Sequence, residues 1–375
     1  MRDAGFRTIV CAEVPDHSVI ARFRKRHRGD LETLFVEVLK LCHAAGLVRL
    51  GVVALDGTKV KANASLAANQ TSKSLEAEVA AMLSEAEAID AAEDGMFGEG
   101  RGDDVPVGLR SRQIGCPSSL CHERLLREAD HQRVEQQEKI NARIAEEKAN
   151  GKAKRGRKPK TAEAVVKEEA KANVSDPDSR IMKSRKGYLQ GYNAQAVVTA
   201  DQIILATDVT NQANDVRQLA PMIARTLTMM EAVTGDEAVL GVGLFDAGYW
   251  SDENAATETA ECEYLIATTK DWKQRKAMRD APPPRGRIPR DMSARDQMER
   301  KLLTQRGRKL YRLRGQTVEP VFGQMKETQG ADGFMMRGEQ ETQGEWNLHC
   351  AAHNIKKLHS ESVRRGRKGG KWLLN

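Results

Sequence analysis

The segment Leu50-Gly-Val-Val-Ala-Leu-Asp-Gly57 is the stretch that decides the fold class. It is a short apolar run that contains β-branched residues and ends in an aspartate, which is typical of a buried strand. A second apolar run, Ala238–Phe245, also ends in an aspartate, Asp246, which Ala247-Gly248 follows. Open α/β sheets present functional groups where strands leave the core. The two runs therefore predict an α/β sheet that delivers Asp56 and Asp246 at exposed strand ends.

The sequence around these two runs predicts helices and a hairpin. Apolar residues recur at helical spacing in 31–45, and Asp30 is expected to cap that helix. Two β-rich runs, 188–199 and 202–209, predict a hairpin. Further helices are predicted at 18–27, 215–231, 251–260 and 345–358, with Ser251 as the N-cap of the third. A strand is predicted at 264–269. The charged stretch 293–329 is predicted to be helical, with interruptions at Gly307, Gly315 and Pro320.

Residues 65–171 have a different composition, in which Ala, Glu, Lys and Gln dominate. Long helices are expected at 76–92 and 123–149, with a Gly-rich linker between them. Because a structureless loop of this length is improbable inside a compact domain, the segment is expected to be a helical subdomain inserted after the first strand. Its basic end contains Arg155 and Arg157, which predict either a hook for the DNA minor groove or simply a solvated run of charge.

The bulk composition limits the class of protein. The chain has 375 residues, with 60 Lys and Arg against 53 Asp and Glu, so the net charge of +7 favours a polyanionic partner. Its 6 cysteines are scattered, which favours a reducing cytoplasm over a disulfide framework. No stretch approaches the ~20 apolar residues of a membrane span. We expect a protein of the cytoplasm with no membrane partner.

A third acid, Glu319, lies in Thr317-Val-Glu-Pro-Val-Phe322. Its apolar neighbours predict that it is partly buried against the sheet, where a carboxylate needs a cation or hydrogen bonds. A salt bridge to Lys326 or to Arg314 would also satisfy it. Taken singly, Asp56 and Asp246 are equally compatible with a turn or a helix cap, because Asp-Gly is common in turns.

An ordered series of motifs gives these acids a more specific interpretation. The chain resembles bacterial transposases of the insertion-sequence 1182 group, within the wider insertion-sequence 4/5-like DDE class. The resemblance spans nearly the whole chain and rests on Pro15-Asp-His-Ser, Val53-Ala-Leu-Asp56-Gly-Thr-Lys59, Asp176-Pro-Asp-Ser-Arg180, Gln190-Gly-Tyr-Asn-Ala-Gln195, Asp208-Val-Thr-Asn-Gln-Ala-Asn-Asp215, Asp246-Ala-Gly-Tyr-Trp250, Glu319-Pro-Val-Phe-Gly-Gln-Met-Lys326, Gly344-Glu-Trp346 and Ala352-His-Asn354.

The resemblance implies an RNase H-like mixed sheet and a DDE transposase that cleaves the ends of its element and joins them to target DNA. Asp56, Asp246 and Glu319 would then be the catalytic and metal-binding residues, with two Mg²⁺ (or Mn²⁺) ions as cofactors. Hard carboxylate oxygens suit Mg²⁺, and two ions can stabilise the attacking and leaving oxygens of a phosphodiester. Asp56 is expected to bridge both ions, with Asp246 on one and Glu319 on the other.

Three further residues are expected to contact DNA. In the wider class a Lys follows the Glu by seven positions, and Lys326 fits that spacing as a point charge for a phosphate. Tyr249 and Arg314 complete the expectation, although Gly315 stands where a basic residue is usual. Trp250, Trp272 and Trp346 are expected to pack in the core or dock helices, with stacking on flipped bases as the alternative.

The motif order also predicts the domain layout. Residues 48–64 and 172–360 would form the catalytic domain, 65–171 the insertion, and 361–375 a basic tail. Residues 1–47 would form a helical region; because the family usually has a longer one, a truncated DNA-binding part is one interpretation. Double-stranded DNA is the expected partner, in a nucleoid-associated homodimer assembled on it. The alternatives are a catalytically silent DNA-binding remnant that acts as a repressor, and a metal-dependent nuclease.

Overall fold

A computed structural model describes residues 16–97, 117–153, 156, 158–165, 170–184, 187–236, 238–286, 289 and 291–367. The chain divides into two compact units. The first is Met1–Asn63 with Met182–Asn375, and the second is Ala64–Ile181. Within the described residues, no helix combines the length and the apolar character needed to cross a membrane.

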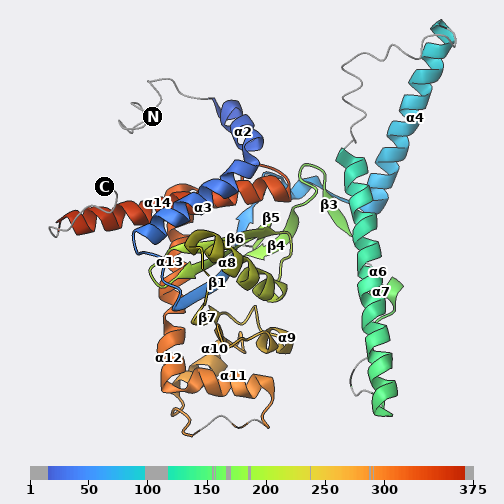
Figure 1. The fold of residues 1–375 in the computed structure, drawn as a ribbon. Helices are drawn as coiled ribbons and strands as arrows, with labels where there is room; N and C mark the ends of the chain where they lie inside the picture. The colour runs from blue at the N-terminus through green and yellow to red at the C-terminus, as the bar shows by residue number, and fades with distance from the viewer. Residues whose placement is uncertain are drawn as a thin grey trace. The chain divides into compact units, whose positions relative to one another are not determined.

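The first unit is built on a mixed sheet (Figure 1). Its central strand β1 (Val52–Lys61) pairs antiparallel with β5 (Gly187–Thr199) and parallel with β7 (Val242–Phe245). β7 pairs parallel with β8 (Glu263–Ile266), while β6 (Ile204–Thr210) pairs antiparallel with β5. The strand order is β4-β5-β1-β7-β8, with β4 at Arg180–Ser184 and β6 beside β5. The predicted α/β class and the predicted hairpin are both present.

Asp56 is not at the end of its strand, as the sequence had suggested. The parallel pairing of β1 with β7 stops at Leu55 and Phe245. On its other side, however, β1 stays paired with β5 as far as Lys61 and Gly191. The expected strand end at Asp56 is therefore wrong, because the partner that extends the strand lies far away in the sequence. Asp246 is the first residue after β7, as predicted.

Four long helices pack against this sheet or against one another. α13 (Arg314–Gln329) contacts β1 and β5, and α8 (Leu219–Thr234) contacts β5 and β6. α14 (Glu339–Arg367) packs on β6 and on α3 (Arg28–Ala44), beside which it lies in Figure 1. Their apolar faces and both faces of the central strands supply the buried core, which explains the near-continuous apolar runs of β1 and β7.

Polar side chains fix α14 to the sheet. Trp346 is 1% exposed and its Nε1 donates to the Gln195 carbonyl at 3.0 Å. The Asn354 amide accepts from the Ile204 N–H and donates to its carbonyl, both at 2.9 Å. The core interpretation of Trp346 is thereby confirmed. The side chain of Trp272 lies outside the described residues.

The remaining helices of this unit are short. They are α2 (His17–Arg26), η2 (Val216–Gln218), α9 (Asp252–Ala256), α10 (Trp272–Asp280), α11 (Ala294–Leu303) and α12 (Gln305–Arg312). Ser251 caps α9, as predicted, by accepting from the Asn254 N–H at 3.0 Å. Asp30, in contrast, lies in the first turn of α3, whose N-cap is His27.

The charged stretch 293–329 breaks at Thr304 and Leu313, and not at the predicted Gly307, Gly315 and Pro320. Pro320 lies inside α13, where it cannot donate to the carbonyl of Gln316. That carbonyl accepts instead from Gln202 Nε2 at 2.9 Å. A side chain from the turn between β5 and β6 therefore replaces the missing helical hydrogen bond, which no local pattern could reveal.

In the part of it that the structure describes, the second unit contains two long helices and a two-stranded sheet. α4 (Ser72–Phe97) and α6 (Pro117–Asn150) include the two predicted helical stretches. β2 (Asn69–Thr71) pairs antiparallel with β3 (Lys171–Asn173), and the short η1 (Leu66–Ala68) and α7 (Ala162–Val165) complete the unit. A small core of Leu75, Cys121, Leu125 and Ala172 holds α4, α6 and β3 together.

Candidate active site

The register of the sheet brings two acids to neighbouring positions. Leu55 of β1 pairs with Phe245 of β7, so the next residues along the two parallel strands are Asp56 and Asp246. Asp56 Oδ1 accepts from the Gly57 N–H at 2.9 Å, and Asp246 Oδ1 accepts from the Gly248 N–H at 2.7 Å. Both carboxylates are therefore oriented by backbone groups of the segments that carry them.

Arg314, at the start of α13, joins Asp56 to the third predicted acid. Its Nη2 lies 2.7 Å from Asp56 Oδ2, and its Nη1 lies 3.6 Å from Glu319 Oε1. The Arg314 side chain is 14% exposed and that of Glu319 is 62% exposed. The expectation that Glu319 is partly buried is wrong, because Val318, Val321 and Phe322 occupy the inner face of α13 and leave Glu319 outside. The predicted alternative, a salt bridge to Arg314, is present.

The electrostatics of Asp56 are dominated by its burial, with charged neighbours of both signs nearby. The pKa of its carboxyl is raised to about 7, mainly by burial; Arg314 and the Gly57 N–H lower this pKa, whereas the charges of Asp246 and Asp215 raise it. Removing a carboxylate from water disfavours its charged form, and a like charge nearby adds to that effect. An additional cation at this position would favour the charged form.

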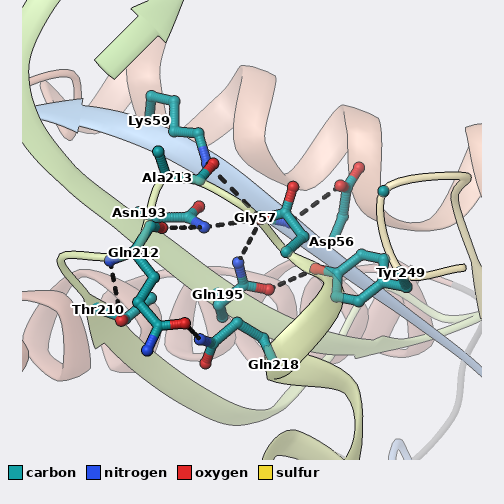
Figure 2. A network of polar contacts seen from close by, with 12 residues as sticks. Asp56, Gly57, Lys59, Asn193, Gln195, Thr210, Gln212, Ala213, Gln218 and Tyr249 are labelled. Carbon is teal, nitrogen blue, oxygen red and sulfur yellow. Dashed lines mark hydrogen bonds and ion pairs between the residues drawn. The ribbon is translucent and has the colours of Figure 1, made fainter. Parts of the chain in front are cut away.

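Tyr249 faces inward, in the turn after β7. It is fully buried, and its hydroxyl donates to Gln195 Oε1 of β5 (Figure 2). Burial and the surrounding acids raise its pKa well above the usual value, which keeps the phenol protonated as a donor. In this structure the Tyr249 hydroxyl is therefore buried and bonded to Gln195, and its predicted contact with DNA stays a prediction.

Two lysines connect α13 and a neighbouring loop to β1. Lys326 Nζ donates to the Lys59 carbonyl at 3.0 Å, which places this residue of α13 beside the central strand. Lys59 Nζ in turn donates to the Ala213 carbonyl at 2.8 Å and lies 3.6 Å from Asp215 Oδ1. Arg155 and Arg157, predicted to contact DNA, lie outside the described residues.

Asp215 belongs to the same cluster, although sequence reasoning assigned it no role. Its Oδ1 accepts from Asn193 Nδ2 at 2.7 Å and from Gln195 Nε2 at 2.9 Å. Asn193 and Gln195 are two residues apart on β5, so they project to one face of the sheet. The segments that contain these residues carried part of the family resemblance, and that was the only signal available for them.

Packing, and not a turn, restricts the residue at Gly57. An ideal Cβ on Gly57 would lie 2.3 Å from Gln195 Nε2, and 2.7 Å from both Asn193 Oδ1 and Asp215 Oδ1. Gly248 is similarly restricted, since its Cβ would lie 2.8 Å from Asp246 Oδ1 and 3.2 Å from Asp215 Oδ2. Gly57 and Gly248 therefore make room for the polar cluster, and Figure 2 shows the part of it around Gly57.

A cavity of about 670 Å³ adjoins this edge of the sheet. Residues 267–269, which follow β8, line it together with Leu302, Tyr311 and the side chains of Arg279, Arg308 and Arg312. The Tyr311 hydroxyl donates to the Phe245 carbonyl at 3.1 Å, one residue before Asp246. The cavity thus combines apolar walls with positive charge close to the acids.

Carboxylates dominate the donor set, which is the chemistry that Mg²⁺ and Mn²⁺ prefer. Among the residues that the structure describes, no group of three or more His, Cys, Asp or Glu side chains is gathered closely enough to hold a metal ion. Asp56 and Asp246 could supply the ligands on one side of such a site. The guanidinium of Arg314 lies between Asp56 and Glu319.

Comparison with known proteins found a match in the C-terminal part of the chain. Residues 258–359 match the family model described as a transposase DDE domain, which supports a DDE transposase family for this chain. The matched stretch contains Arg314, Glu319 and Lys326, whereas Asp56 and Asp246 precede it. No curated protein and no solved structure matches the chain.

Proposed function

We propose that the chain is a DDE transposase of the insertion-sequence 1182 type, which cleaves the ends of its element and transfers them into target DNA. The observation that carries the proposal is the placement of Asp56 and Asp246 side by side on parallel strands, with Arg314 linking Asp56 to Glu319. The match to a transposase DDE domain over residues 258–359 supports the role of Glu319. The mixed sheet is compatible with an RNase H-like catalytic domain.

Asp56, Asp246 and Glu319 would supply the oxygen ligands of a divalent-metal site. When bound, two Mg²⁺ ions would stabilise the attacking and leaving oxygens of the scissile phosphodiester. Asp56 and Asp246 are oriented for this role by the N–H groups of Gly57 and Gly248. Arg314 would leave Asp56 when the site fills, and its guanidinium would then be free to bind a DNA phosphate.

Two chemical steps would follow at this site. Water would first attack the phosphodiester at the element boundary and release a 3′-hydroxyl. That hydroxyl would then attack a phosphodiester of target DNA, so that one bond forms as another breaks. The positive charge of Arg279 and Arg312 beside the site would hold the DNA backbone there, since phosphate contacts position a duplex.

A cleavage assay tests the proposal. Purified protein is incubated with Mg²⁺ or Mn²⁺ and a duplex that carries the terminal repeat of its element together with flanking DNA. We expect nicking at the repeat boundary, and loss of nicking in Asp56→Ala, Asp246→Ala and Glu319→Ala. Glu327→Ala is the matched control, because Glu327 is an exposed acid on the same helix as Glu319.

The other outcomes separate the alternatives. Equal cleavage by wild type and by the three variants would refute the assignment of the acids. Binding without cleavage would favour a repressor, and cleavage without joining would favour a nuclease. In each case the affinity for DNA should fall steeply as salt rises, because binding releases counterions from the phosphates.

A further inference from the structure

We propose that Asp215 is a positioning residue of this active site, which holds the turn that carries Asp246 through Gln195 and Tyr249. The inference rests on the proposed function. It assigns no metal or substrate contact to Asp215. Its basis is the pair of hydrogen bonds that this side chain accepts from two residues of β5, together with the ammonium group of Lys59 on β1.

Asp215 is itself held firmly. Besides the bonds from Asn193 and Gln195, its Oδ1 faces the ammonium group of Lys59 at 3.6 Å. The loop before it is fixed by the same side chains, since Asn193 Nδ2 also donates to the Gln212 carbonyl at 3.1 Å and Lys59 donates to Ala213. Figure 2 shows Lys59, Asn193 and Gln195 gathered around Gly57.

The first connection from Asp215 to Asp246 runs through the side-chain amide of Gln195, whose nitrogen and oxygen both form hydrogen bonds. Gln195 Nε2 donates to Asp215, and Gln195 Oε1 accepts from the Tyr249 hydroxyl. Because the nitrogen can only donate and the oxygen can only accept, these two partners select one orientation of the amide. Removal of the Asp215 carboxylate would free the amide to turn and would leave the buried Tyr249 hydroxyl without a fixed acceptor.

A second connection uses the backbone beside Asp215. Asn254 Nδ2 donates to the Val216 carbonyl at 2.6 Å and to the Tyr249 carbonyl at 2.7 Å. The Tyr249 N–H donates to the Asp246 carbonyl at 3.2 Å, which closes the turn. Displacement of the segment around Asp215 would therefore reach Asp246 by two routes.

This arrangement predicts a specific kinetic defect. The partners that orient metal ligands typically contribute about 10- to 100-fold to metal affinity or activity. We expect Asp215→Ala to lower the single-turnover cleavage rate about 10- to 100-fold and to raise the Mg²⁺ concentration for half-maximal rate. The dissociation constant for the terminal-repeat duplex should change less than about twofold, because the proposed role of Asp215 includes no contact with DNA. Asp215→Asn keeps an acceptor oxygen and should recover much of the rate.

Two controls keep the test decisive. Asp208→Ala removes a similarly half-buried carboxylate that pairs with Arg225 at 3.6 Å, and it should leave the rate and the Mg²⁺ requirement unchanged. Tyr249→Phe removes the hydroxyl at the far end of the connection. If Asp215 acts through Tyr249, the double variant Asp215→Ala with Tyr249→Phe should be less impaired than the product of the two single effects.

The results separate this inference from the proposed function. If Asp56→Ala and Asp246→Ala abolish cleavage while folded Asp215→Ala cleaves like wild type with the same Mg²⁺ requirement, the positioning role is refuted. A loss explained wholly by weaker DNA binding would also refute it. Should Asp215→Ala not fold, Tyr249→Phe decides, and an unchanged cleavage rate and Mg²⁺ requirement in that variant would overturn the proposal. If Asp56→Ala and Asp246→Ala retain cleavage, the proposed function itself is refuted.

Discussion

The two halves of the proposed site are built in different ways. Asp56 and Asp246 belong to segments that backbone pairing places side by side, and each carboxylate accepts a backbone N–H. Glu319 lies on the exposed face of α13 and is joined to the others through one guanidinium, at 3.6 Å. The strand half is therefore preorganised, whereas the helix half depends on side chains that solvent reaches. Closure of the site around metal ions would have to come mainly from α13.

The largest loss of stability is expected from substitution of Gly57, where the side chains around Asp56 are most tightly packed. Gly57→Ala would place a methyl group 2.3 Å from Gln195 Nε2, in a network that has little freedom to move. Overpacking of this kind costs about 1–3 kcal/mol, and the displaced amide would also disturb Tyr249. We expect Gly57→Ala to lower the free energy of unfolding by about 2–3 kcal/mol in urea titrations and to cleave far more slowly.

Gly51→Ala is the matched control, because it is close to Gly57 in the chain and nothing lies within 4 Å of its ideal Cβ. It should change stability by no more than about 0.5 kcal/mol. If Gly57→Ala behaves like this control, the polar cluster is adaptable and the strand half is less rigid than its contacts indicate.

The same contrast explains what the sequence could and could not predict. The apolar runs before Asp56 and Asp246 predicted strands, and the Ser251 cap was visible, because burial periodicity and capping are local. The end of β1 was misplaced, since pairing with β5 carries the strand on to Lys61. Strand length here depends on a partner from another part of the chain.

The polar residues of the site were harder to predict than its strands. Asp215 stands before a short helix, where an acid is ordinarily a cap, and its partners come from β1 and β5. The apolar neighbours of Glu319 did indicate that α13 packs on the sheet, but they could not say that Glu319 itself points outward. These placements are decided by tertiary contacts, which a residue's neighbours in sequence do not encode.

An intermediate loss of stability is expected from substitution of Arg314, whose guanidinium links Asp56 to Glu319. Arg314→Gln would remove the cation that lies 2.7 Å from Asp56, while Asp246 and Asp215 remain nearby. Breaking a partly buried pair leaves a carboxylate unpaired, and we expect a loss of about 1–2 kcal/mol in metal-free buffer. Arg312→Gln, at an exposed position two residues earlier, should cost less than about 0.5 kcal/mol in the same urea titration. Equal stability of the two variants would mean that Arg314 does not tie α13 to the strand half.

The smallest effect on stability is expected at Glu319, although its effect on cleavage should be large. Its side chain is 62% exposed and its ion pair with Arg314 is long, at 3.6 Å. Exposed pairs of this kind contribute about 0–1 kcal/mol, so Glu319→Gln should change the free energy of unfolding by less than about 0.5 kcal/mol. A large stability loss would show that Glu319 is part of the packed framework. Near-wild-type stability together with lost cleavage would identify Glu319 as a residue held ready for catalysis, because a group that contributes little to the resting fold can move toward the two strand acids without disrupting it.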